Sequence, residues 1–475
     1  MRKGFLMVLA VALVAVLAAP AVAGTDINGF YRAKGYVSNF KTNASTASLS
    51  NNAGTAGYVE QRMRIRFSFG EENVKAVWFS EIDFAAWGDS AGSAPPAGGA
   101  ARNSGGALGG DKINLETKNV YVWFKVPDTS LDFTVGLQNQ TDNFQGLLYG
   151  AADMGGIFAT GKYEPISWKL GWAKLYENST SSWDDFTLYM GAVNYAPSKD
   201  LKLGFSLYVL QNDTQKSAAN LPGAAYAANS TNTYLNTVPN SWLVYTPGID
   251  FAWNAGPVAL SGFVLYQFGD VDPFDSTIDS VSVSGLALDL RADANLGPGK
   301  GFLEALYVSG GDNNPGGDYK SIITLSDFNA SPGGNSAFTR LDYSILMGNA
   351  DDINTNQCLI GCAAPASVGA SSPSNGGRGM WTAGLGYTMK VADKTSWKIG
   401  GGYLQAVKLT QADNTQGRSK DMGMEINTNL QYNIMKGLDF GLYAAYAFLG
   451  DFYHVNGVAD PDDPWDLHFR LNYAF

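Results

Sequence analysis

The amino-acid sequence predicts an all-β protein, a transmembrane antiparallel up-and-down β-barrel of about 18 strands with short periplasmic turns and long extracellular loops. Three observations predict this fold. Many short segments alternate apolar and polar residues, the connections between them are alternately short and long, and the final segment ends in an aromatic residue, Phe475. A strand with lipid on one side and water on the other needs this period-two alternation over about ten positions.

The N-terminal segment has the three parts of a secretory signal peptide. Two basic residues at positions 2 and 3 precede an apolar run, and small residues provide a cleavage site before Gly24. We therefore predict a cleaved signal peptide over residues 1–23 and one barrel domain over residues 24–475. Export from a Gram-negative cell would bring this barrel to the outer membrane.

About eighteen alternating segments follow one another from Gly24 to the C-terminus. Gly, Pro, Asn, Asp and Ser separate them, as expected for turns. The predicted strands are 27–39, 58–69, 74–84, 113–126, 131–140, 156–163, 167–176, 186–196, 201–211, 242–254, 258–268, 281–296, 301–309, 380–390, 396–407, 421–433, 438–449 and 465–475. An even count returns the last strand to the side where the first begins.

Short and long connections alternate along the chain. Short turns are predicted at 70–73, 127–130, 197–200, 255–257, 297–300 and 435–437, and long loops at 40–57, 85–112, 141–155, 212–241 and 310–379. Outer-membrane barrels place short turns in the periplasm and long loops outside. The asymmetry therefore supports the barrel and predicts its orientation.

Charge and composition exclude several classes of function. The chain has 43 Asp and Glu against 32 Lys and Arg, a net charge of −11, which disfavours nucleic acid as a partner. Beyond the signal peptide, no apolar stretch approaches the ~20 residues of a membrane helix. His454 and His468 are the only imidazoles, so we expect no metal centre, no cofactor and no enzymatic activity. A soluble β-sandwich or β-helix remains the alternative fold.

Basic residues share one face of the second predicted strand. Arg62, Arg64 and Arg66 alternate with apolar residues. An arginine that faces lipid near the membrane midplane costs ~2–4 kcal/mol, so we predict that these three face the lumen. The same alternation predicts further lumen residues: Arg32, Lys34, Glu60, Glu81 and Asp83 nearby, and Lys169, Asp289, Arg291, Asp293, Lys398, Glu425, Asp439, Asp466 and Arg470 on later strands.

The charged patch on the first three strands has two interpretations. In one, its field orients and selects charged solutes, because a narrow lumen with low-dielectric walls focuses the field of wall charges. In the other, the same groups form an ion-pair network that only stiffens the wall. The sequence favours neither.

The connection at 141–155 is a candidate constriction loop. It contains apolar residues, including Phe144 and Leu148, together with Asp142 and Asp153. In general porins the third external loop narrows the pore opposite a basic wall, and this connection is the third external loop in the predicted order. We predict that it folds into the lumen. The alternative is that it packs on the rim with both carboxylates in solvent.

Both cysteines, Cys358 and Cys362, lie in the longest connection, 310–379. An exported chain folds in an oxidising compartment, so we predict a small loop disulfide between them. The same connection contains the oxygen-bearing side chains Asp312, Asn313, Asn314 and Asp318. These could bind calcium, but their spacing is not that of a dedicated calcium loop, so we favour a solvated acidic turn.

Parts of the sequence resemble a known family. The segments at 58–67 (YVEQRMRIRF) and 104–138 and the terminal strand LHFRLNYAF resemble the homotrimeric outer-membrane porins of sulfate-reducing and related anaerobic bacteria. The resemblance implies a homotrimer of water-filled barrels, surrounded by outer-membrane lipid and lipopolysaccharide, through which small hydrophilic solutes diffuse. The terminal Phe475 resembles the signal that the barrel-assembly machinery recognises.

A second, weaker resemblance supports an alternative. Residues 422–451 are similar to the late strands of alginate-export-type barrels, which implies a substrate-specific or polysaccharide-export channel. A basic lumen would suit a polyanion, whereas the mixed signs of the predicted lumen residues argue against one. An adhesive role for the long loops is the remaining functional class.

Overall fold

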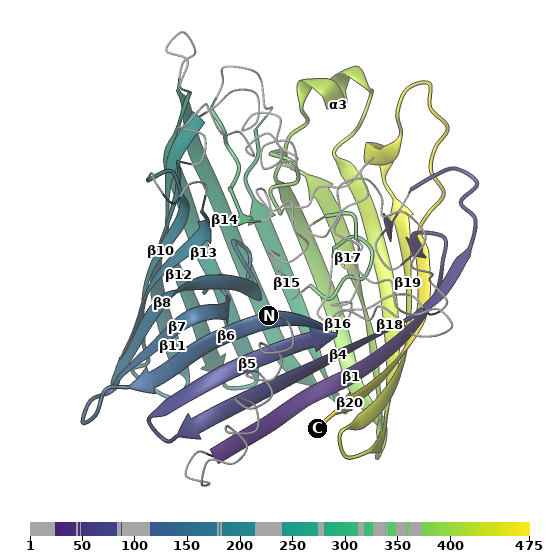
Figure 1. Cartoon of the computed structure of the whole chain (residues 1–475). Coiled ribbons are helices and arrows are strands. Elements are labelled where there is room, and N and C mark those ends of the chain that lie inside the picture. The colour runs from purple at the N-terminus through teal and green to yellow at the C-terminus, as the bar shows by residue number, and fades with distance from the viewer. Residues whose placement is uncertain are drawn as a thin grey trace, which may run out of the picture.

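A single closed sheet makes up most of the computed structural model, which describes residues 24–43, 46–47, 49–82, 87, 115–177, 180, 183–213, 240–273, 280–311, 318–325, 338, 341–347, 358–360 and 373–475. The described residues form an 18-stranded antiparallel sheet (Figure 1). It closes because β1 pairs with both β4 and β20. This confirms the predicted fold class.

The strands correspond to the predicted segments one by one. They are β1 (Gly24–Ser38), β4 (Ala56–Glu71), β5 (Val74–Ile82), β6 (Leu115–Lys125), β7 (Leu131–Gln140), β8 (Ala152–Tyr163), β9 (Ile166–Tyr176), β10 (Phe186–Tyr195), β11 (Leu201–Asn212), β12 (Asn240–Ala255), β13 (Val258–Pro273), β14 (Val281–Leu296), β15 (Gly299–Val308), β16 (Met380–Ala392), β17 (Thr395–Ala406), β18 (Asp421–Met435), β19 (Leu438–Leu449) and β20 (Trp465–Ala474). The connections add the hairpin of β2 (Lys41–Asn43) and β3 (Thr46–Ala47), the helix α3 (Gln411–Thr415) and the 3-10 turn η3 (Asp451–Tyr453).

No helix in the described part of the chain is long and apolar enough to cross a membrane.

The tight turns all lie at one rim of the barrel, together with the end of β20. The turns after β12 and β14 place Gly256 and Gly297 at φ values of 76° and 59°, a left-handed conformation that glycine adopts without steric cost. The strand ends that lead into the long connections lie at the opposite rim. We call these two ends the short-turn rim and the long-loop rim.

The two faces of the sheet differ in the way that the alternation predicts. Along β13, Phe263, Leu265 and Gln267 are at most 4% exposed, whereas the intervening Tyr266 and Phe268 are 48% and 44% exposed. Large apolar side chains therefore cover the outer face, as expected for a wall in contact with lipid. The buried side chains point into the barrel.

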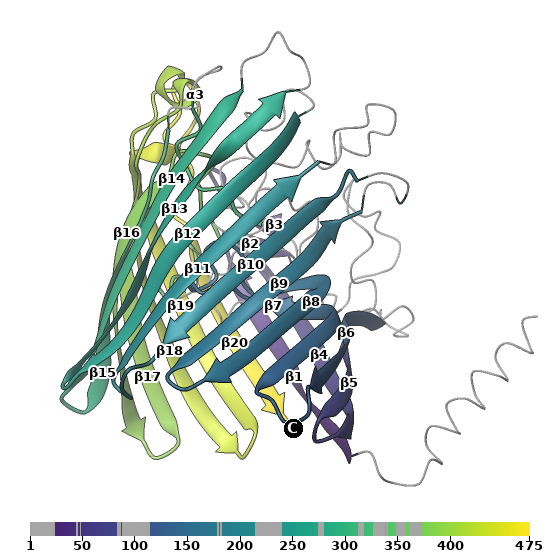
Figure 2. The same cartoon turned by 90° about the vertical axis from the view of Figure 1, so that its left-hand side faces the viewer.

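The wall is not of even height (Figure 2). The strands β12, β13 and β14 each have 16 residues, whereas β5 has nine. Inward-facing apolar side chains line the tall side, and Arg62, Arg64 and Arg66 lie on β4, next to the short strand β5.

Candidate functional site

The predicted basic residues lie on the inner face of the wall. Arg62 and Arg64 of β4 pair in register with Arg32 and Phe30 of β1. The alternate residues of β1 include Ile27 and Val37, which are 53% and 43% exposed on the outer face. Because side chains alternate between the two faces of a strand, the arginines point inward.

One carboxylate holds two of these arginines. Glu81 of β5 accepts Arg62 Nε and Arg64 Nη2 at 2.8 Å each, and its side chain is 7% exposed. The contact supports the wall-stiffening interpretation, since an ion pair with so little solvent around it fixes three side chains. The group nevertheless keeps a net positive charge, because two guanidinium groups share one carboxylate.

The basic surface continues across β1 to the last strands. Arg32 donates from Nε to Asn472 Oδ1 at 3.2 Å, and Arg470 lies 3.6 Å from Asp439. Lys34 pairs in register with both Glu60 and Arg470. We define the basic wall by its charged members on β1, β4, β5 and β20: Arg32, Lys34, Glu60, Arg62, Arg64, Arg66, Glu81, Asp466 and Arg470.

A buried imidazole belongs to the same wall. His468 stacks on Tyr443 with ring centroids 4.5 Å apart, and its Nδ1 lies 2.7 Å from Asp466. Asp466 also accepts Lys41 Nζ at 3.3 Å. Asp83, the remaining predicted member of the patch, lies outside the described residues.

Residues 141–151 fold into the barrel around a single carboxylate. Asp142 accepts the backbone N–H groups of Phe144, Gly146, Leu148 and Tyr149 at 2.7 to 3.0 Å. Asp142 is only 5% exposed. Four charge-assisted hydrogen bonds offset the cost of burying this charge and fix the shape of the segment.

The same segment packs against the inner wall on the tall side. The Phe144 ring lies 5.6 Å from Tyr208 of β11 and 5.5 Å from Phe263 of β13, both inward-facing. Asn143 donates to Ser206 at 2.9 Å. The apolar residues of the loop thus become part of an internal core rather than of the rim.

Asp153 lies in β8 instead of in the inward-folded segment. Because β8 begins at Ala152, Asp153 pairs in register with Asn139 of β7. It accepts Lys118 Nζ at 2.6 Å and Asn119 Nδ2 at 2.7 Å. Asp153 therefore pairs with Lys118 of β6, whereas Asp142 binds only backbone N–H groups among the described residues.

A second internal segment comes from the connection between β15 and β16. Tyr319 forms an isolated parallel β-bridge with Val283 of β14. The side chain of Gln267, fully buried in β13, accepts the N–H of Ile323 at 2.5 Å and donates to its carbonyl at 3.0 Å. The Gln267 amide therefore forms with Ile323 the same two hydrogen bonds that a backbone residue of a neighbouring strand would form.

Further along this connection, one glutamate binds three consecutive backbone groups. Glu425 of β18 accepts the N–H groups of Ser344, Ile345 and Leu346 at 2.7 to 2.9 Å. Glu425 is fully buried. Tyr343 adds a hydrogen bond to Thr382 Oγ1 at 2.9 Å. Side chains of β16 and β18 thus fix the position of residues 343–346.

The two internal segments contact each other. Leu325 donates its N–H to Leu148 O at 2.9 Å, and their apolar side chains join one buried cluster with those of β8 to β19. In the order of strands, β11 to β13 lie opposite β1. The interior therefore has residues 141–151 and 318–325 on β11 to β14, across from the basic wall, and residues 341–347 on β16 and β18.

Several residues of the predicted disulfide and of the predicted acidic turn lie outside the part of the chain that the structure describes. Cys358 is buried and disulfide-bonded, and Cys362 lies outside the described residues, so the pairing stays a prediction. Asp312, Asn313 and Asn314 also lie outside them. Within the described ranges, no group of three or more His, Cys, Asp or Glu side chains is arranged to hold a metal ion.

Gln267 was not predicted as a functional residue. The available signal was one amide in an otherwise apolar inward row of β13, which indicates a buried polar group in need of a partner. Glu425 was predicted to face the lumen, but its contacts with a distant connection have no local sequence signal.

The class that the fold defines is a closed 18-strand antiparallel barrel, and solved barrels of this kind match nearly the whole chain. OccAB2 of Acinetobacter baumannii matches with a TM-score of 0.52 and 10% identity over 95% of this chain and 98% of that one. OccK11 (OpdR) of Pseudomonas aeruginosa gives 0.51 and 9% over 95% and 96%. The outer membrane protein opdK of the same species gives 0.50 and 10% over 95% and 98%. At sequence identities this low, these comparisons show a shared fold only.

No protein-family model matches the chain, and no curated protein matches its sequence.

Proposed function

We propose that this chain is a substrate-selective outer-membrane channel through which small charged solutes, anions in preference to cations, pass down their gradient. The observation that carries the proposal is the filling of the barrel by two wall-anchored segments: residues 141–151 and 318–325 contact β11 to β14, opposite the basic wall, and residues 341–347 contact β16 and β18. A lumen narrowed in this way brings each solute close to the wall charges, where their field is focused rather than screened. The general porin, with a wide and weakly selective lumen, is less compatible with this filling.

Placement in the outer membrane rests on separate support. The sequence predicts export, the outer wall is apolar, and the C-terminal residue is aromatic. Phe475 exchanges backbone hydrogen bonds with Gly29 of β1 at 2.9 and 3.0 Å, so the proposed assembly signal lies at the closing seam of the barrel. Outer-membrane lipid, lipopolysaccharide and the barrel-assembly machinery are the corresponding proposed partners, and a homotrimer is the proposed assembly.

Export of a polysaccharide is the second candidate that the sequence raised. A long polymer needs an uninterrupted conduit, whereas the internal segments are fixed by fully buried hydrogen bonds from Gln267 and Glu425. Short solutes fit such an interior better than a polymer does.

Planar-bilayer recordings of the refolded chain test the proposal. We expect small unitary conductance and a reversal potential that favours anions in a salt gradient. Replacing Arg62, Arg64 and Glu81 together by glutamine removes the net positive charge of their cluster without leaving the glutamate unpaired, so the reversal potential should shift toward cations. The shift should be largest at low salt, because screening is least there.

A matched control neutralises an ion pair on the other side of the barrel. Arg291 Nη1 lies 2.9 Å from Glu304, so replacing both by glutamine removes a wall pair without changing the net charge. This variant should leave the reversal potential unchanged. A large, unselective conductance in the unmodified chain would instead support the general porin, and no conductance at all would support a closed or adhesive barrel.

A further inference from the structure

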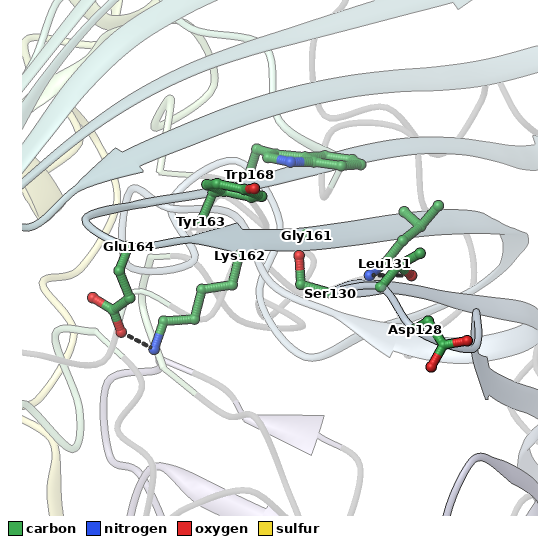
Figure 3. Close-up of a pocket in the computed structure, with 9 residues that line it drawn as sticks. Asp128, Ser130, Leu131, Gly161, Lys162, Tyr163, Glu164 and Trp168 are labelled. Atoms are coloured by element: carbon green, nitrogen blue, oxygen red, sulfur yellow. Dashed lines mark hydrogen bonds and ion pairs between the residues drawn. The ribbon is translucent and has the colours of Figure 1, made fainter.

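Lys169 of β9 points into the barrel. Its sequence neighbour Leu170 is 56% exposed on the outer face. Figure 3 shows its other neighbour, Trp168, on one side of the sheet, and the ion pair of Lys162 and Glu164 on the other. Because successive side chains of a strand point to opposite faces, Lys169 lies on the side of Lys162, which is the lumen.

The positive charge of Lys169 is not compensated by any described residue. Lys118 on the low wall lies 2.6 Å from Asp153, so its charge is neutralised. Lys169 instead donates from Nζ to Gln140 Oε1, and this Nζ lies 5.5 Å from the centroid of the Phe158 ring. Both partners are neutral. Lys169 has no ion pair with any residue that the structure describes.

A chain of oriented amides holds the ammonium group in place. Gln140 donates from Nε2 to Gln138 Oε1 at 3.1 Å, and Gln138 donates from Nε2 to the carbonyls of Thr134 and Gly136 at 3.3 and 3.4 Å. The two glutamines are at most 9% exposed. The backbone carbonyls accept only donors, so they fix the orientation of each amide in turn. Gln140 therefore presents its oxygen to Lys169.

This contact brings Lys169 to the constriction segment. Gln140 is the last residue of β7 and directly precedes residues 141–151, which fold into the lumen. In register, Gln140 pairs with Ala152 at the start of β8, whereas Lys169 pairs with Thr160 near its other end. A side-chain contact between positions so far apart along β8 means that this end of β7 leans into the lumen toward Lys169.

We propose that Lys169 forms an anion-binding site at the constriction, where it holds the anionic group of a solute as it passes residues 141–151. One N–H of the ammonium group binds Gln140, and the others have no acceptor among the described residues. An anion supplies both the acceptor and the missing negative charge. The inference rests on the proposed channel function, but the site is separate from the basic wall, so the two proposals can fail independently.

Two substitutions of different chemistry test the site in planar-bilayer recordings. Lys169→Gln removes the charge, and Gln140→Glu keeps the lysine but gives it a carboxylate. Each should lower the anion-to-cation permeability ratio at low salt by about twofold to fivefold, the range of one partly screened ionic contact. The double variant should shift the ratio further toward cations, because it leaves a lone carboxylate. Lys169→Arg should retain the ratio of the unmodified chain.

Chloride binding provides a measurement that does not need an open channel. In the refolded full chain in detergent micelles, bound chloride relaxes faster than free chloride, so the site should broaden the chloride NMR line. Lys169→Gln and Gln140→Glu should both remove this broadening, although only one of them removes the lysine. A chain that is silent in bilayers would contradict the proposed function, and the chloride line width would still decide whether the site exists.

Lys202 provides a matched control. It is an exposed lysine on β11, beside the outward-facing Leu203, and therefore on the inner face of the wall. Lys202→Gln removes the same charge as Lys169→Gln, but it should change the permeability ratio less and leave the chloride line width unaltered. Equal effects of the two variants would overturn the proposal, because the summed charge of the lumen would then be responsible. An unchanged line width in Lys169→Gln would overturn it as well.

Discussion

At the scale of single residues, three buried polar side chains determine where the internal segments lie. Asp142, Gln267 and Glu425 each bind backbone N–H groups of a connection, and each is at most 5% exposed. A backbone donor buried without an acceptor costs about 1–3 kcal/mol, so each side chain removes a penalty that would otherwise expel the segment.

Glu425→Leu should release the segment around Ser344–Leu346. The substitution removes the acceptor of three buried N–H groups, each costing roughly 1–3 kcal/mol when left without a partner. Hydrogen exchange at residues 344–346 should accelerate, and single-channel records should show larger or more frequently fluctuating conductance. As a control, Asp439→Asn changes a partly exposed inward carboxylate that pairs with Arg470. Equal exchange protection at residues 344–346 in both variants and the unmodified chain would contradict the prediction.

At the scale of elements, the period-two alternation predicted all eighteen strands. This works because lipid on one side and polar groups on the other impose the period on every strand independently. Boundaries were less well predicted. Residues 152–155 belong to β8 although their glycine and polar content resembles a loop, because pairing with β7 supplies hydrogen bonds that local composition does not reveal.

The internal segments show what alternation cannot predict. The inward fold of 141–155 was predicted from its apolar residues and from its place as the third external loop. The sequence contains no such signal for residues 318–325 and 341–347, which are fixed by side chains from β13 and β18 that are far away along the chain. Contacts between distant segments leave no periodic signal in either segment.

The external connection that contains α3 should respond to acid. Arg378 forms a bidentate contact with Asp413, from Nε at 2.6 Å and from Nη2 at 2.8 Å. Burial by itself would raise the pKa of Asp413, but the hydrogen bonds and charge of Arg378, together with the bonds from Thr410, hold that pKa below its usual value. A lowered pKa means that the contact stabilises the connection at neutral pH, and that this stabilisation is lost as the pH falls below about 4 toward the lowered pKa.

A spin label at position 414 would report this change. Its mobility should be low at pH 7 and higher at an acid pH below about 4, because the contact is lost as the pH falls toward the lowered pKa. Asp413→Asn should make the label mobile at both pH values, whereas a label at position 180, in the connection between β9 and β10, should be insensitive to the substitution. An acid response that persists in Asp413→Asn would mean that another group is responsible.

At the scale of the whole molecule, the closed sheet does not depend on the internal segment that connects β15 to β16. The eighteen strands close through β1 and β20 without any described residue of the connection between β15 and β16. The two ends of that connection lie together, because Gly311 donates its N–H to Gly377 O at 2.9 Å. A short Gly/Ser linker can therefore replace residues 312–372 without stretching the wall.

The spliced chain should fold as a barrel and conduct several-fold better, because the lumen would lose the side chains that fill it on the tall side. Its anion preference should fall as well, since solutes would pass farther from Arg62 and Arg64. Folding is checked by heat-dependent mobility on gels, and conductance and selectivity by bilayer recording. Adding Glu425→Leu to the spliced chain provides the internal control. That substitution acts through residues 344–346, so it should have no further effect on conductance once they are absent. An unchanged conductance in a correctly folded spliced chain would mean that the internal segments do not limit permeation and that the constriction lies at residues 141–151 alone.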